Sequence, residues 1–219
     1  MNSYIAATAK SPPIDCGLCP RLVQFRDKNN AEWPDWHNAP VSSFGPLSAR
    51  LLIVGLAPGL RGANRTGRPF TGDYAGDLLY QTLGKFGFAE GNYDKRPDDG
   101  LALSDCRIAN AVRCLPPENK PIGAEVNNCR PFLVAEINAM ENLKLILALG
   151  GIAHNTLLST LGERRADFKF AHCAMHRLSG DILLADSYHC SRYNTNTGRL
   201  TEEMFEDVFR SIREIIPAG

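Results

Sequence analysis

Four cysteines in two widely separated segments have a spacing that indicates a site for a bound metal group. Cys16 and Cys19 form a C-x-x-C, and Cys114 and Cys129 lie far downstream. We expect these thiols in a reducing compartment, because the N-terminus lacks the charged-then-apolar order of a secretory leader. There, a cysteine cluster is typical of a metal site rather than of disulfides. Four thiolates suit either a four-iron, four-sulfur (4Fe-4S) cluster or a structural zinc ion.

A second candidate site is the segment 55-GLAPGLRGANRTGRPFTGD-73, which is rich in glycine and arginine and has no acid before Asp73. Glycines permit close backbone approach to a ligand, and Arg61, Arg65 and Arg68 have the chemistry to contact phosphate oxygens. The spacing fits neither a Walker loop nor a dinucleotide-binding fingerprint. Composition alone leaves open a surface loop whose arginines are only solvated.

The third unusual segment, 188-YHCSRYNTNTGRL-200, contains Arg192 and Arg199 and no acid. Ser191 and the neighbouring hydroxyl and amide side chains are suitable donors to phosphates, although a simple polar turn is the alternative. The other histidines outside this segment are assigned structural roles. These are His37, His154, His172 and His176.

Short apolar runs that alternate with helical patterns predict the elements that position these segments. We expect strands at 51–55, 107–112, 145–150 and 182–187. We expect helices at 20–28, 75–86, 131–143 and 152–161, and a last helix that Thr201 caps. The alternation predicts a three-layer α/β/α sandwich with a central, mainly parallel four-stranded sheet. In such sheets, ligands bind in the loops beyond the carboxyl ends of the strands.

Length and charge fit a single domain over residues 1–219, whose N-terminal segment 1–48 carries two of the four cysteines. The chain has 24 Lys plus Arg and 24 Asp plus Glu. This neutral total argues against wholesale coating of nucleic acid but allows a local basic cleft. No apolar run approaches the ~20 residues that span a bilayer, so no membrane partner is expected.

The first motif, GLAPG…GANRTGRPFTGD, paired with 189-HCSRYNTNTGRLT-201, resembles the type-B uracil-DNA glycosylases, the fifth family of their superfamily. The cysteine spacing resembles that of the iron-sulfur glycosylases of the fourth and fifth families. The resemblance extends from Cys16 to about Thr201. It implies a DNA repair enzyme that hydrolyses the N-glycosidic bond of uracil in double-stranded DNA and leaves an abasic site. It also favours a structural 4Fe-4S cluster over zinc.

The resemblance implies a role for each residue that would handle a flipped base. Phe70 would stack on the base, and Asn110 would hydrogen-bond its pairing edge through the donor and acceptor of one amide. His189 would donate to the base oxygen on which negative charge develops. Further donors would come from the backbone around the predicted substrate-binding residues Leu56, Ala57 and Gly59.

Asp73 has two open interpretations. It is the nearest acid able to orient a water molecule or steady the cationic sugar, but it could equally cap the 75–86 helix. The superfamily often carries a carboxylate or an asparagine inside the first motif, where this chain has Leu56 and Ala57. The small Ala57 predicts room for larger deaminated bases, namely hypoxanthine and xanthine.

The second motif is expected to hold DNA, with Arg192 and Tyr193 placed as a wedge that fills the gap left by the flipped nucleotide. Cys190 departs from the family pattern, which has proline after the histidine, and would place a thiol near DNA. The remaining cysteines, Cys106 and Cys173, are expected to be buried small hydrophobes. The enzyme is expected to be a cytoplasmic monomer, nucleoid-associated when bound to DNA.

Three alternatives stay open. The first is a uracil-restricted glycosylase similar to the fourth family, and the second is a catalytically weakened DNA-binding relative, for which Cys190 is the motive. The third is a zinc-stabilised structural or interaction protein. The leading hypothesis is monofunctional, because no lysine or proline amine is among the proposed site residues to form a Schiff base.

Overall fold

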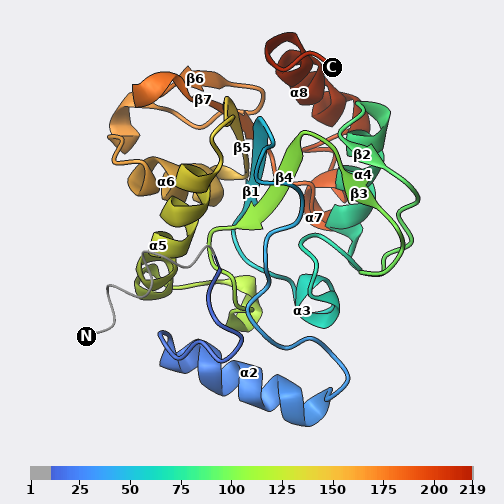
Figure 1. Cartoon of the computed structure of the whole chain (residues 1–219), viewed down its shortest axis with the longest axis vertical. Helices are drawn as coiled ribbons and strands as arrows, with labels where there is room; N and C mark the ends of the chain where they lie inside the picture. Colours follow the sequence, from blue (N-terminus) through green and yellow to red (C-terminus); the bar gives the residue numbers. More distant parts are fainter. Residues whose placement is uncertain (1–10, 219) are drawn as a thin grey trace.

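A five-stranded sheet forms the centre of the protein in the computed structural model, which describes residues 11–218 (Figure 1). Its strand order is β4–β1–β5–β7–β6. Four strands are parallel, namely β1 (Leu51–Gly55), β4 (Cys106–Asn110), β5 (Leu145–Leu149) and β7 (Leu183–Ser187). The fifth, β6 (Met175–Arg177), pairs antiparallel to β7 at the edge. The predicted α/β class is therefore confirmed, whereas the predicted count of four strands is one too low.

The two faces of the sheet are buried by different helices, because alternate residues of a strand point to opposite sides. In β1, Leu51 and Ile53 join the core cluster under α4 (Tyr74–Lys85) and α8 (Glu202–Ile215). Leu52 and Val54 join the other cluster, under α5 (Gly123–Ala139) and α6 (Gly151–Thr160). Figure 1 shows the α4/α8 and α5/α6 pairs on opposite sides of the strands, which are the expected three layers.

Two helices differ from the sequence-based expectation. Helix α5 begins at Gly123, eight residues before the predicted start, and contains Pro131 in its interior. Its first turn is satisfied because the Glu125 carboxylate accepts from the Ile122 backbone N–H at 2.9 Å. A short helix, α7 (Arg192–Asn196), replaces part of the expected polar loop, and Ser191 caps it. The expected cap of α8 is confirmed, since Thr201 Oγ1 accepts from Met204 N.

The N-terminal helix α2 (Pro20–Glu32) is anchored to α5. Arg21 donates from Nε and Nη2 to the two carboxylate oxygens of Glu125, both at 2.7 Å. Leu22 packs against Val112 and Phe132. Residues 1–10 of the N-terminal segment lie outside the described part of the chain. None of the helices within residues 11–218 is long and apolar enough to cross a membrane.

Short elements complete the fold around the sheet. A two-stranded antiparallel ribbon, β2 (Ala89–Glu90) and β3 (Ala102–Leu103), follows α4. The helix α3 (Ala63–Thr66) lies inside the glycine- and arginine-rich loop after β1. Three 3₁₀ turns connect the other elements, at Pro117–Asn119, Arg165–Asp167 and Ser179–Asp181.

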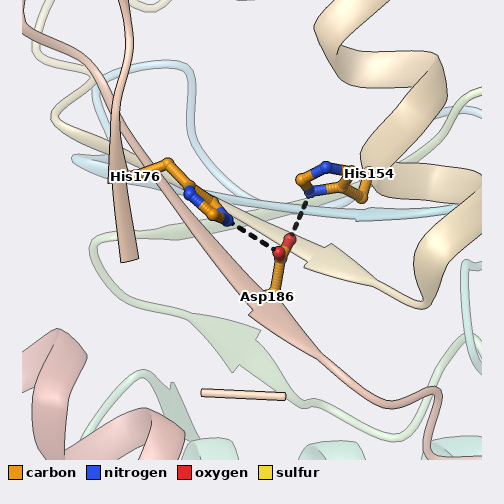
Figure 2. Close-up of side chains that lie close together, drawn as sticks. All are labelled: His154, His176 and Asp186. Carbon is orange, nitrogen blue, oxygen red and sulfur yellow. Dashed lines mark hydrogen bonds and ion pairs between the residues drawn. The ribbon is translucent and has the colours of Figure 1, made fainter. Parts of the chain in front are cut away.

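A buried polar cluster ties α6, β6 and β7 together (Figure 2). The Asp186 carboxylate lies 2.7 Å from His154 Nδ1 and 3.0 Å from His176 Nε2. The opposite nitrogen of His154, Nε2, lies 3.0 Å from the Phe168 carbonyl oxygen and donates to it. The structural roles expected of His154 and His176 are consistent with these bonds.

Candidate active site and cysteine cavity

A cleft lies at the carboxyl ends of β1, β4 and β7, the edge where parallel sheets bind ligands. Phe70 comes from the loop after β1, Asn110 ends β4, and His189 follows β7. All three side chains line this cleft, together with Asp73. The structure thus brings the three residues expected to read the base into one cavity, from segments far apart in the sequence.

Gly55 lets Phe70 and Asn110 approach each other at the end of β1. A Cβ atom on Gly55 would lie only 2.6 Å from Asn110 Oδ1 and 2.7 Å from Phe70 Cζ. The Phe70 ring centroid lies 6.0 Å from that of His189, with 31° between the ring planes. The cleft therefore presents an aromatic face, an amide and an imidazole within a few ångströms, and residue 55 must lack a side chain.

His189 is held at the end of β7 by bonds to its backbone. Asn194 Nδ2 in α7 donates to the His189 carbonyl oxygen at 2.8 Å. Within residues 11–218, no hydrogen bond engages its ring nitrogens, so they are available to a ligand. Burial lowers the pKa of His189, which favours the neutral imidazole. The α7 turn therefore constrains this loop, in which the proline of the family motif is absent.

Asp73 fits both interpretations that the sequence left open. Its Oδ1 accepts from Gly76 N at 3.2 Å and caps α4. Its Oδ2 lies over Gly59 and Gly62, since a Cβ on these residues would be 3.2 Å and 2.2 Å from that oxygen. Burial raises the pKa of the Asp73 carboxyl group. One carboxylate therefore serves the helix while it also lines the cleft.

The arginines expected to hold DNA divide into two groups. Arg61 and Arg192 are exposed and line the cleft with Ser191. Arg65, Arg199 and Tyr193 are exposed as well but lie outside its lining. The guanidinium of Arg192 lies 5.4 Å from the Tyr74 ring centroid, and that of Arg199 lies 4.7 Å from the Tyr188 ring centroid. These side chains are accessible to a DNA strand that crosses the cleft.

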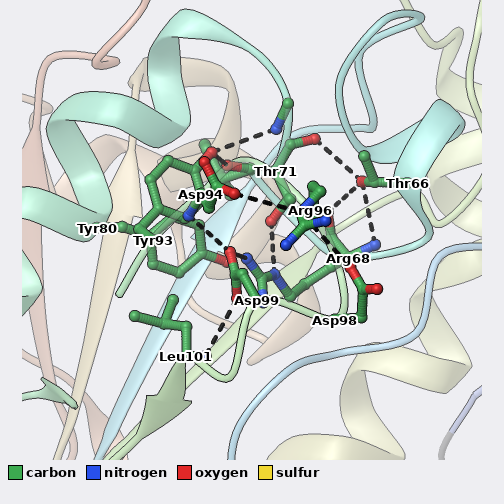
Figure 3. Close-up of polar contacts among 12 residues, drawn as sticks. Thr66, Arg68, Thr71, Tyr80, Tyr93, Asp94, Arg96, Asp98, Asp99 and Leu101 are labelled. Carbon is green, nitrogen blue, oxygen red and sulfur yellow. Dashed lines mark hydrogen bonds and ion pairs between the residues drawn. The ribbon is translucent and has the colours of Figure 1, made fainter. Parts of the chain in front are cut away.

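Arg68 does not fit the expectation that it contacts DNA. Its side chain is 5 % exposed and forms two hydrogen bonds of 2.8 Å with the Asp99 carboxylate (Figure 3). Asp99 is itself 1 % exposed. Because the guanidinium is enclosed and its charge is paired, Arg68 is part of the support beneath the loop. The glycine- and arginine-rich composition gave no sign of this difference among the three arginines.

The other cysteines also correct two expectations. Cys190 is fully buried in the core under α4 and α8, so its thiol does not face DNA, and burial raises its pKa to about 12. Cys173 is exposed rather than buried, whereas Cys106 is buried as expected. Burial of Cys190 corrects the expectation of a thiol near DNA, whereas the proline of the family motif is still replaced at this position.

Two residues of the cleft were missed by sequence analysis. Tyr74, at the start of α4, lines the cleft beside Arg192. Asn119 also lines it, from the proline-rich loop after Cys114, with a backbone φ of 56° that is uncommon for a residue other than glycine. Pro116, Pro117 and Pro121 predict irregular structure in this segment but not its return to the cleft. No local pattern in the sequence predicts such a return.

The four cysteines of the two distant segments line one cavity between α2 and the start of α5. Burial raises the pKa of Cys114 to about 12 and that of Cys129 to about 11, so bare thiolates would be unfavourable there. Two donors point at the sulfurs, Arg113 N at 3.4 Å from Cys129 Sγ and Asn128 Nδ2 at 3.6 Å from Cys19 Sγ. The donor set and the cavity fit a metal group bound by thiolates.

The sulfurs are too far apart for a single ion as they stand. Within residues 11–218, His154, His176 and Asp186 form the only group of three potential metal-binding residues whose ligand atoms lie within 4.8 Å of one another. No three cysteine sulfurs meet that limit. Around one tetrahedral zinc ion, with Zn–S bonds of about 2.3 Å, the sulfurs would be about 3.8 Å apart.

Comparison with known proteins identifies the class that this fold and cleft define. The family model described as "Uracil DNA glycosylase superfamily" matches residues 42–213, and the chain belongs to that superfamily. It is 41 % identical to the Type-5 uracil-DNA glycosylase of Thermus thermophilus, over 91 % of this chain and 93 % of that protein. The type-5 enzyme of Pyrobaculum aerophilum is 39 % identical over 90 % and 87 %. A type-4 enzyme of the same organism is 33 % identical over 80 % and 77 %.

Proposed function

We propose that this protein is a monofunctional uracil-DNA glycosylase, which hydrolyses the bond between uracil and deoxyribose in DNA and leaves an abasic site. The observation that carries the proposal is the convergence of Phe70, Asn110 and His189 in one cleft at the carboxyl edge of the sheet. The superfamily match and the type-5 relatives support the same activity. No lysine lines the cleft within the described residues, which favours hydrolysis over a Schiff base.

In the mechanism we propose, the cleft stabilises a base that leaves as an anion. Phe70 stacks on the flipped uracil, and the Asn110 amide pairs with its edge. The glycosidic bond breaks with its electron pair going to the base. The neutral His189 imidazole donates a hydrogen bond to the base oxygen that gains negative charge, without bringing a net charge of its own into the buried site.

Asp73 completes the reaction on the sugar side. Its carboxylate orients a water molecule whose oxygen bonds to the sugar carbon, and it accepts the proton that the water loses. The raised pKa of the buried Asp73 makes it a better proton acceptor than an exposed aspartate. Capping α4 does not compete with this role, because the cap uses Oδ1 and leaves Oδ2 toward Gly59 and Gly62.

The rim of the cleft fits a DNA backbone. We assign phosphate contacts to Arg61, Arg65, Arg192 and Arg199 and to Ser191, since phosphate recognition uses such donors. Tyr193 is 73 % exposed at the start of α7, where a wedge would enter the duplex. Asn119 and Tyr74 add a polar and an aromatic group to the same cleft. The partner is therefore double-stranded DNA with a deaminated base.

The base range follows from the small residue at position 57. Ala57 lines the cleft next to Leu56 and Gly59, and we expect its methyl group to leave room for a purine. We propose that hypoxanthine, and xanthine with it, are released as well as uracil. An Ala57→Val variant should keep uracil release and lose most hypoxanthine release.

The decisive experiment is a glycosylase assay on duplexes with one uracil or one hypoxanthine. We expect alkali-sensitive abasic sites from both duplexes. Release of uracil alone would indicate a uracil-restricted enzyme like those of type 4. Binding of both duplexes without release of either base would contradict the catalytic proposal.

We propose a structural 4Fe-4S cluster at Cys16, Cys19, Cys114 and Cys129. The wide separation of the sulfurs in a common cavity favours a multi-iron cluster over one zinc ion. The cluster would join α2 to the exit of β4, four residues after Asn110. We further infer a monomer in the cytoplasm, associated with the nucleoid through DNA. Colourless protein with stoichiometric zinc would overturn the iron assignment.

A further inference from the structure

Phe70 has an unfavourable backbone conformation that the surrounding structure must maintain. Its φ is 52°, in the left-handed region that a residue with a Cβ rarely occupies. Its ring nevertheless faces the cleft, and its side chain is among the buried residues of the core. Such strain persists where neighbouring groups determine the conformation, and it is common at active sites.

Two tyrosine hydroxyl groups hold the backbone on either side of the Phe70 Cα. The Tyr80 hydroxyl donates to the Pro69 carbonyl oxygen at 2.7 Å. The Tyr93 hydroxyl donates to the Phe70 carbonyl oxygen at 3.2 Å and accepts from Gly72 N at 3.2 Å. Burial raises the pKa of Tyr93 to about 12, so its hydroxyl remains a donor at any working pH.

The two tyrosines are themselves fixed by the enclosed Arg68–Asp99 pair (Figure 3). The Arg68 guanidinium lies 5.5 Å from the Tyr80 ring centroid and 5.8 Å from that of Tyr93, within cation–π range. Its Nε donates to Thr71 Oγ1 at 2.8 Å, which connects the pair to the residue after Phe70. Asp99 also accepts from the backbone of Asp94 and Leu101, and these bonds fix the loop that carries Tyr93.

The first turn of α4 adds a further constraint on the Phe70 backbone. A Cβ on Gly76 would lie 1.8 Å from the Phe70 carbonyl oxygen and 2.5 Å from the Tyr93 hydroxyl. The Phe70 backbone therefore packs closely against the first turn of α4, the helix that also carries Tyr80, and residue 76 must lack a side chain. None of Arg68, Tyr80, Tyr93 and Asp99 lines the cleft, so none can act on a base directly.

We propose that Tyr93, supported by Tyr80 and the Arg68–Asp99 pair, is a positioning residue that holds the Phe70 ring in place to receive the flipped base. This inference rests on the proposed stacking role of Phe70. A ring already held in its stacking position loses little freedom when the base arrives, so more of the stacking energy stabilises the reacting complex. Arg68 thus contributes to base release by supporting the loop that carries Phe70, and it does not contact phosphate.

The test is a double-mutant cycle between Tyr93→Phe and Phe70→Ala, measured by single-turnover release of uracil from a duplex. Tyr93→Phe keeps the ring next to Arg68 but removes both hydroxyl bonds. We expect a loss in kcat/KM of about tenfold, as for two hydrogen bonds of ordinary strength, with unchanged affinity for undamaged duplex. In the Phe70→Ala background, the same change should cost almost nothing, because the group that it positions is gone.

Two further variants make the outcomes distinct. Tyr188→Phe removes a hydroxyl that makes no hydrogen bond within residues 11–218 and should retain full activity. Tyr80→Phe, which loses only the bond to Pro69, should give a smaller loss of the same kind and replaces Tyr93→Phe if that variant does not fold. Wild-type kinetics for both variants, or losses that add to that of Phe70→Ala, would overturn the proposal. An active Phe70→Ala enzyme would instead overturn the stacking role on which it rests.

Discussion

Asp73 and His189 face the same cleft, and burial changes the acidity of each in the direction that disfavours charge. For Asp73 this means a raised pKa, and for His189 a lowered one. The proposed reaction needs Asp73 ionised, to accept a proton, and His189 neutral, to donate a hydrogen bond without a buried positive charge. Both forms coexist at any pH above the pKa values of the two groups.

The pH profile of uracil release follows from these two directions. As the pH falls, the rate should drop where Asp73 becomes protonated, which is above the ordinary aspartate value because its pKa is raised. His189 should add no drop at the ordinary histidine value near pH 6.5, because its lowered pKa moves protonation of the imidazole to lower pH. The measurement is single-turnover release of uracil from pH 4 to 9.

The matched variant is Asp73→Asn, which retains a side-chain oxygen to cap α4. It should lower the rate by about 10²-fold or more and abolish the acidic limb of the profile. A variant with full turnover and a normal profile would show that Asp73 only caps the helix.

The resemblance of the two motifs to known glycosylases was enough to predict that Phe70, Asn110 and His189 lie around one cleft, whereas their roles there stay a prediction. The same motifs did not predict that Arg68 and Cys190 are buried, because both residues stand beside exposed ones in the sequence. Burial of an individual side chain depends on partners far away in the sequence, such as Asp99 for Arg68, and no local pattern predicts such a contact. For the same reason, Asn119 was missed.

At the scale of elements, β7 connects the cleft to the structural cluster of Figure 2. Asp186 lies on this strand three residues before His189 and holds His154 of α6 and His176 of β6. The bonds fix the strand between its neighbours and thereby the point from which His189 leaves it. Stability and catalysis are therefore linked through one strand.

Replacing the buried carboxylate should destabilise these elements strongly. Asp186→Ala leaves two buried imidazoles without their acceptor and should lower the free energy of unfolding by about 3 kcal/mol. Asp98→Ala, at an exposed aspartate in a loop, is the matched control and should leave the unfolding transition unchanged. Urea unfolding followed by circular dichroism measures both. An unchanged midpoint for Asp186→Ala would show that the cluster adds no stability.

The strongest elements were predictable and the weakest were not. The four parallel strands are apolar runs, and the stripe and cap of α8 are plain in the sequence. Strand β6 has only three residues, which are half-exposed or exposed, so pairing with β7 rather than its own pattern defines it. The early start of α5 was missed because its first turns face α2 and the cysteine cavity, where polar residues such as Glu125 are used. Pro131 then suggested a start that is in fact a helix interior.

At the scale of the whole molecule, the N-terminal segment is attached to the catalytic sheet at the cysteine cavity. Cys114 follows Asn110 closely at the exit of β4, so a group that binds Cys114 also fixes the base-reading strand. Through the proposed cluster, Cys16 and Cys19 would attach α2 to the same point. Loss of the proposed cluster should therefore affect the cleft as well as α2.

A Cys114→Ser variant tests this coupling. It should lose most of its iron and acid-labile sulfide, unfold at a lower temperature and release uracil more slowly than the parent, because the end of β4 is no longer fixed. Cys173→Ser alters an exposed thiol outside the cavity and should match the parent in all three measurements. If Cys114→Ser keeps its iron, the ligand assignment is wrong.

The arrangement of charge affects how the enzyme searches a genome. The total charge is zero, yet the exposed arginines 61, 65, 192 and 199 belong to the two loops that form the cleft. With about four phosphates neutralised, log affinity should fall with log salt at a slope near −4, which is modest for a DNA-binding protein. The protein should then bind DNA mainly when the cleft meets the duplex, because the rest of its surface attracts DNA only weakly. Such an enzyme dissociates readily between undamaged sites and samples DNA by many brief visits.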